Sequence, residues 1–176
     1  MAGPGIRVGG ALDPLASFAE RDASDDDVDA LYRLHEQTMR AYVALTYGPW
    51  EDGDQRRRFR EAFVSRRTRV LVESDGTSET RAASARIVAA FQIERRAGQH
   101  FLSSIEVAAG YQGRGIGSAI VRRFVEEARA SGAEATLQVL KSNSAARRLY
   151  ERLGFVVTGD TTTHDAMRAM VSSLER

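Results

Sequence analysis

The spacing of apolar residues along the chain predicts four helices. In the best defined of them, Ile116, Ile120, Phe124 and Ala128 recur at every fourth position, which places them on one helix face. Gly132 then ends this helix. Similar spacing and capping residues predict the other helices at about 25–45, 51–65 and 143–153.

Seven β-rich runs lie around these helices. They are short blocks of apolar or alternating residues between turn residues, at 15–20, 69–74, 85–94, 99–107, 135–140, 155–158 and 163–171. Hairpins dominate the first half, and one strand–helix–strand unit follows in the second. This order indicates an α/β (or α+β) fold, with a mixed, mostly antiparallel sheet of about seven strands flanked by four helices.

Length and composition narrow the class of protein. The 176 residues suit one domain, placed at 13–176 after a flexible, glycine-rich tail at 1–12. The net charge of +1 gives no general field for nucleic acid, and neither a membrane span nor a signal peptide is predicted. The absence of cysteine excludes disulfides and a cysteine nucleophile. We expect a cytoplasmic protein without nucleic-acid or membrane partners; a homodimer is compatible with the sequence.

A glycine-rich turn joins the strand that ends near Val107 to the following helix. Glycines let the backbone approach a ligand closely, and the first N–H groups of a helix have no intrahelical acceptors. Such a turn can hold a phosphate group. It lacks the Gly-Lys-Ser/Thr of an NTPase loop and the G-x-G-x-x-G spacing of a dinucleotide site.

Two motifs together resemble those of the GNAT superfamily of N-acetyltransferases. The turn reads Q-x-x-G-x-G from Gln112 to Gly117, and N-x-x-A-x-x-L-Y-x-x-x-G-F runs from Asn143 to Phe155. They stand in the family's order, one helix and one strand apart. The resemblance covers the chain well from Arg69 onward and the two N-terminal helices more loosely.

The resemblance implies that acetyl-CoA lies between the strand ending at Val107 and the strand at 136–140, which splay apart. Backbone N–H groups of the turn would hold the pyrophosphate, and Arg114 would add charge-assisted bonds. No metal is expected. The implied cofactor-binding residues are Ile105, Val107, Gln112, Gly113, Arg114, Gly115, Ile116, Gly117, Asn143 and Tyr150.

Amine acetylation needs a neutral amine and a proton for the departing thiolate. Deprotonating a lysine-like amine at pH 7 costs about 4.6 kcal/mol, which a general base offsets. The resemblance makes Tyr150 the acid; the alternative is a core aromatic on the face of Ala146 and Leu149. In ribosomal-protein alanine acetyltransferases a glutamate stands twelve residues before this tyrosine, but here the position is Gln138. Glu106 is therefore the candidate base, against the alternative of an ordinary strand-surface charge.

The resemblance implies that the first two helices and the last hairpin form the acceptor pocket. For His35 the alternative to a role in binding is core packing, for Tyr47 and Trp50 it is anchoring of the turn after the first helix, and Glu36 could bind a cationic acceptor. The candidates are His35, Glu36, Tyr47, Trp50 and Gln138. The first hypothesis for function is acetyl transfer to a primary amine of a small molecule. A protein or peptide N-acetyltransferase and a non-catalytic acyl-CoA sensor are the alternatives.

Overall fold

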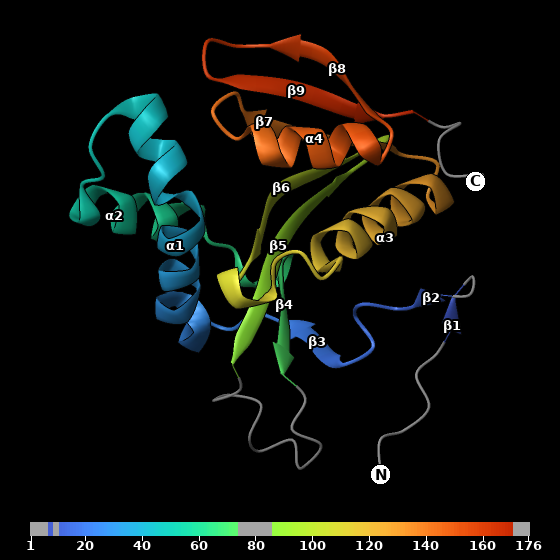
Figure 1. Ribbon diagram of the computed structural model, residues 1–176, viewed down its shortest axis with the longest axis horizontal. Helices are drawn as coiled ribbons and strands as arrows, with labels where there is room; N and C mark the ends of the chain where they lie inside the picture. The colour runs from blue at the N-terminus through green and yellow to red at the C-terminus, as the bar shows by residue number, and fades with distance from the viewer. Residues whose placement is uncertain (1–6, 9–10, 74–85, 171–176) are drawn as a thin grey trace.

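The computed structural model describes residues 7–8, 11–73 and 86–170 (Figure 1). Its helices are α1 (Val28–Tyr47), α2 (Asp52–Ala62), α3 (Ile116–Ala130) and α4 (Ser144–Arg152). Its main strands are β3 (Phe18–Asp22), β4 (Thr68–Glu73), β5 (Ile87–Arg96), β6 (Gln99–Val107), β7 (Glu134–Leu140), β8 (Phe155–Asp160) and β9 (His164–Ala169). None of the helices in these ranges is long and apolar enough to cross a bilayer.

The seven main strands form one sheet in the order β3-β4-β5-β6-β7-β9-β8. β6 and β7 are parallel, because α3 connects them, and every other neighbouring pair is antiparallel. The predicted mixed, mostly antiparallel sheet with four helices is therefore confirmed. The predicted tail contains a short hairpin of β1 (Arg7–Val8) and β2 (Ala11–Leu12); its flexibility stays a prediction.

Some predicted boundaries are wrong by a few residues. The first strand begins at Phe18 because the preceding residues form a turn, in which the Phe18 N–H donates to Leu15 O at 3.0 Å. The second helix ends at Ala62, where Phe63 adopts an extended backbone. The first helix starts as a 3-10 turn at Asp25–Asp27 and continues to Tyr47. Residues 74, 85 and 171, at the ends of three predicted strands, lie outside the described residues.

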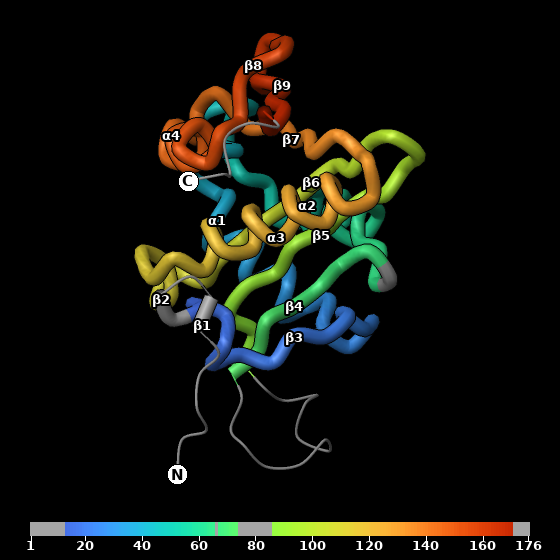
Figure 2. The backbone as a smooth tube through the Cα atoms, turned by 90° about the vertical axis from the view of Figure 1, so that its right-hand side faces the viewer, coloured from blue at the N-terminus to red at the C-terminus, as the bar shows by residue number. Residues whose placement is uncertain are grey.

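The sheet carries a separate apolar core on each face. Leu71, Phe91 and Ile93 pack with α3, β7 and α4, which cover one face; Figure 2 shows α3 lying across the central strands. Val70 and Ala90 point the other way and pack with α1 and the aromatic residues of α2. The alternation of side chains along each strand thus assigns α3 and α4 to one face and α1 and α2 to the other.

The two parallel strands separate halfway along their length. Pairing of β6 with β7 runs from Gln99 opposite Glu134 to Leu102 opposite Leu137, and ends there. At this point β6 contains a bulge. In its pairing with β5, Leu102 is opposite Ile93 and Ser104 is opposite Gln92, which leaves Ser103 as an extra residue. Beyond the bulge β6 stays with β5 while β7 stays with β9. The sheet therefore opens between the ends of β6 and β7.

Candidate active site

The glycine-rich turn ends in a helix start with free backbone donors. Gly115 caps α3 with a φ of 81°, a left-handed conformation that favours glycine. The first N–H group bonded inside the helix is that of Ala119, which donates to Gly115 O at 2.9 Å. The N–H groups of Ile116, Gly117 and Ser118 therefore have no acceptor within α3, and the helix dipole favours an anion there.

The backbone N–H group of Gln112 does not have the free position that was predicted for it. This group is bonded within the turn, to Ala109 O at 3.3 Å, so it is not a free donor for phosphate. The Gln112 side chain Nε2 donates to Val107 O at 2.9 Å and ties the turn to the end of β6. The free donors of the predicted cradle thus begin after Gln112, at Gly113 (φ 74°).

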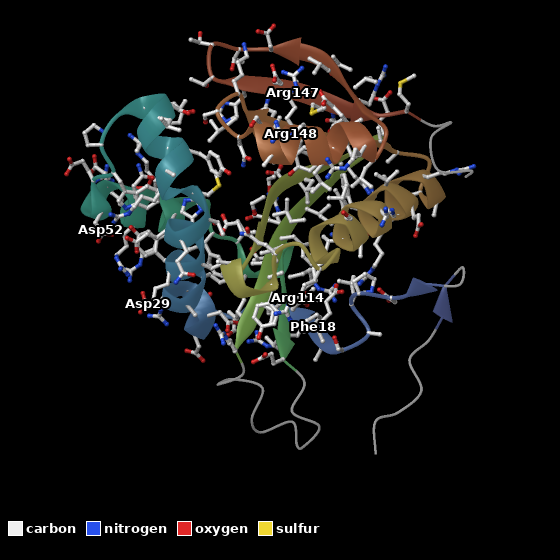
Figure 3. All side chains as sticks on the ribbon, in the orientation of Figure 1. Phe18, Asp29, Asp52, Arg114, Arg147 and Arg148 are labelled. Carbon is white, nitrogen blue, oxygen red and sulfur yellow. The ribbon has the colours of Figure 1, made fainter. Side chains whose placement is uncertain are left out.

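Arg114 and Phe18, labelled in Figure 3, both lie against the ring of Tyr111 in this turn. The Arg114 Cζ atom is 4.9 Å from the centroid of the Tyr111 ring, and the Arg86 Cζ atom is 5.7 Å from it. Tyr111 donates a hydrogen bond to Glu73, which raises the pKa of the tyrosine. None of the ion pairs among the described residues involves Arg114, so its guanidinium keeps its donors for an incoming anion.

The start of α3 lies close to both β6 and α4. A Cβ atom added at Gly117 would lie 3.8 Å from Val107 Cγ2 and 3.9 Å from Leu149 Cδ2. Ile105 and Val107 pack on the core of this face, and Ile116 is buried in it. Ile116 therefore offers a ligand only its backbone. The opening of the sheet, the free N–H groups and α4 meet in one place, which fits a long ligand with a phosphate portion.

α4 contributes Asn143 and Tyr150. The Asn143 Oδ1 accepts a hydrogen bond from the Ala146 N–H at 3.1 Å and caps the helix, which leaves the side-chain amide donors for a ligand. Tyr150 is buried, with its ring centroid 5.9 Å from that of Phe155. Burial raises the pKa of Tyr150 to about 12. No described residue is hydrogen-bonded to its hydroxyl, which stays protonated at neutral pH.

Glu106 is held on the opposite face of the sheet by His35 of α1. Its Oε1 atom lies 2.7 Å from His35 Nδ1, and its side chain is 11% exposed. The His35 ring centroid is 5.2 Å from that of Phe59 and 5.9 Å from that of Trp50. Glu106 is thus a half-enclosed carboxylate with one partner, which excludes an ordinary strand-surface charge.

Glu106 and His35 are part of the lining of a pocket of about 490 Å³ between α1, α2 and the sheet. This volume is within the range of small-molecule sites. Apolar groups make up most of the wall surface, although nine of the fifteen lining residues are polar or charged. Besides His35 and Glu106, the lining includes Leu31, Arg58, Phe59, Ala62, Phe63, Arg67, Ala90, Gln92, Glu94 and Ser104. The spacing of Phe59 and Phe63 gave a signal in the sequence, as a helix stripe.

The other predicted acceptor residues lie outside this pocket. Glu36 is ion-paired with Arg40 of the same helix, so its carboxylate already has a cation. Tyr47 is 60% exposed, and its hydroxyl donates to Thr163 Oγ1 at 3.4 Å. Gln138 is exposed on β7. The structure therefore brings together His35, Trp50 and Glu106, while Glu36, Tyr47 and Gln138 are set apart from them.

Comparison with known proteins finds relatives of this chain by sequence. A family model described as the acetyltransferase (GNAT) family matches residues 28–155. A 55-residue segment is 46% identical to an uncharacterized N-acetyltransferase, YobR, of Bacillus subtilis (strain 168); this is 31% of the present chain and spans only 22% of the relative's length.

Two solved structures have the same fold. The PaiA N-acetyltransferase of Thermoplasma acidophilum, solved in complex with coenzyme A, superposes with a TM-score of 0.65 at 16% identity, over 87% of this chain and 98% of that one. The ribosomal-protein-S18-alanine N-acetyltransferase of Escherichia coli superposes with a TM-score of 0.60 at 21% identity, over 86% and 92%. The family match covers most of the sheet, the glycine turn and the start of β8, and the chain belongs to the GNAT family of acetyltransferases.

Proposed function

We propose that this protein transfers the acetyl group of acetyl-CoA to a primary amine of a small molecule. The observation that carries the proposal is the pocket of about 490 Å³, which includes the Glu106 carboxylate in its lining. A pocket of this size with the Glu106 carboxylate in its lining suits a small amine, which needs a proton acceptor before it can act as a nucleophile.

The cofactor would lie on the α3 side of the opening, held by the N–H groups from Gly113 to Ser118 and by Arg114. The amide of Asn143 and the backbone of Ile105 and Val107 are placed to bind its pantetheine arm. Acetyl-CoA supplies the activated acetyl group, so no enzyme nucleophile is required. This agrees with a chain that has no cysteine.

Glu106 would accept the proton of the amine, directly or through a water molecule. His35 Nδ1, at 2.7 Å, orients the carboxylate. On the other face, the Tyr150 hydroxyl would stabilise the leaving thiolate. Because its pKa is about 12 and that of an ordinary thiol is about 8.5, complete proton transfer from Tyr150 costs roughly 5 kcal/mol. We therefore assign Tyr150 the role of hydrogen-bond donor, rather than the full proton donor that the sequence suggested.

Contacts at the C-terminal end of α1 support a small acceptor over a peptide. Thr46 Oγ1 lies 2.8 Å from Ser142 Oγ in the loop before α4, and Tyr47 reaches Thr163 in the turn between β8 and β9. These bonds connect the end of α1 to the loop before α4 and to the C-terminal hairpin. An extended peptide would need an open groove here, and the bonds close that space.

The test is acetyl-CoA-dependent thiol release with a panel of small primary amines and a panel of peptides, with the N-acetyl product identified by mass. We expect turnover with small amines and little with peptides. Ala62→Phe fills the pocket from α2 and should abolish turnover while coenzyme A binding is retained; Ala130→Phe, at the exposed end of α3, is the control. Turnover of peptides alone, or of no amine despite coenzyme A binding, would contradict the proposal.

A further inference from the structure

We infer that the acceptor has an apolar body and an anionic group, such as a carboxylate, at the end opposite its reactive amine. This inference rests on the proposed function and names the substrate class of the same pocket. It is carried by the arrangement of charges along the pocket floor.

The floor of the pocket runs along one face of β5. Ala90 is paired with Glu106, Gln92 with Ser104, and Glu94 comes two residues later on the same face. At about 3.3 Å per residue, Glu94 lies roughly 13 Å along the strand from the level of Glu106. The pocket therefore has a reactive end at Glu106 and a far end at Glu94.

Positive charge exceeds negative charge at the far end. Glu94 Oε2 already accepts from Arg96 Nη2 at 2.6 Å and lies 3.9 Å from Arg67 Nη1. Two guanidinium groups thus share one carboxylate, and Arg67 is only loosely engaged. The pocket lining as a whole also includes Arg58, which forms no ion pair with any residue in the described ranges. A second ammonium group of a diamine would meet this excess positive charge, whereas a carboxylate would be attracted to it.

Between the two ends, the floor carries the uncharged polar side chains of Gln92 and Ser104. The pocket lining also includes the apolar side chains of Leu31, Phe59 and Phe63. These apolar side chains gain free energy by covering the hydrocarbon part of a ligand, and no charged group of the floor lies between Glu106 and Glu94. An amine and an anionic group separated by an apolar spacer of about 10 Å would match the pocket from end to end.

Three amines of equal length give the test: octylamine, ω-aminooctanoate and α,ω-diaminooctane. With the wild-type protein we expect ω-aminooctanoate to have a kcat/KM about three- to fivefold above that of octylamine, through KM, and the diamine to be the poorest of the three. Arg67→Gln should remove the preference for the carboxylate, and Arg67→Glu should reverse it in favour of the diamine. Arg57→Gln, an exposed arginine of α2 that is paired with Asp54, is the matched control.

Calorimetric binding of the same three amines, with and without coenzyme A, should give the same order without any turnover. A wild-type preference for the diamine, or a carboxylate preference that survives both Arg67→Gln and Arg58→Gln, would overturn this inference while leaving the acetyltransferase proposal intact. Turnover of none of the amines, together with equal binding of all three, would overturn both.

Discussion

The two faces of the sheet build the two halves of the site by different means. On the α3 side, the binding groups are mostly backbone N–H groups, and they come from one contiguous part of the chain, residues 105–155. On the α1 side, the pocket is made of side chains from α1, α2 and three strands. The first and last of these residues, Leu31 and Glu106, are 75 positions apart in the sequence. The backbone half suits a cofactor common to a family, and the side-chain half can vary with the acceptor.

The largest expected effect is on the acceptor face. Glu106→Gln should lower kcat by about 100-fold or more, because the amide does not accept a proton at neutral pH. The amide can still accept a hydrogen bond from His35, so the fold should be retained. Steady-state kinetics should show an unchanged KM for acetyl-CoA, with Glu126→Gln on α3 as the control. A comparable loss of coenzyme A affinity would mean that the two faces are not separate.

Tyr150→Phe is expected to lower kcat by about tenfold, the value of one hydrogen bond to a developing charge. Because burial raises the pKa of Tyr150 to about 12, the wild-type rate should show no decline from ionisation of this group below about pH 11. The pH–rate profiles of the two proteins therefore should have the same shape. A basic limb near pH 10 that is absent from Tyr150→Phe would contradict this assignment.

A smaller effect is expected for His35, which acts through Glu106. His35→Leu should lower kcat about fivefold and change the pH dependence of kcat, because the carboxylate loses its orienting donor at 2.7 Å. His35→Asn, which keeps an N–H donor near the position of Nδ1, should recover part of the rate. Equal rates for the two variants would show that His35 contributes packing alone.

The smallest effect is expected in the backbone half. Gly115→Ala and Gly98→Ala both place a side chain at a positive φ, of 81° and 74°, and each should cost about 1 kcal/mol of unfolding free energy. Only Gly115→Ala should also weaken coenzyme A binding, by a few-fold, because it shifts the cap of α3. Denaturant unfolding and calorimetry separate the two effects, and equal coenzyme A affinities would contradict the predicted cradle.

The same division explains what could be predicted from the sequence. The turn before α3 and the helix α4 depend on local spacing of glycines, Asn143 and apolar residues, so both elements and the order of helices and strands along the chain were predicted correctly. The partner of Glu106 was not predicted, because His35 is 71 positions away and only folding brings α1 over β6. His35 was proposed as an acceptor residue instead. The places of Arg67 and Glu94 at one end of the pocket were not predicted, since these places depend on the pairing of β4, β5 and β6.

Glu36 and Tyr47 show how the lining of the acceptor pocket depends on tertiary packing. Both lie on α1, which contributes His35, and they follow it by one and twelve residues. Glu36 faces along the helix to Arg40, and Tyr47 extends beyond the pocket to the C-terminal hairpin. A helix turns by about 100° per residue, so neighbours in sequence point in different directions, and only the tertiary packing decides which of them faces the site.

The extra residue Ser103 makes β6 more tolerant of losing a residue than of gaining one. Loss of Ser103 would leave an unbroken ladder in which Ser104 still pairs with Gln92 and Glu106 still pairs with Ala90, so the carboxylate would stay on the α1 face. A residue inserted between Ile105 and Glu106 would instead move Glu106 one step along β5 and turn its side chain toward α3. Shortening and lengthening the same strand by one codon would therefore have opposite consequences for the acceptor pocket.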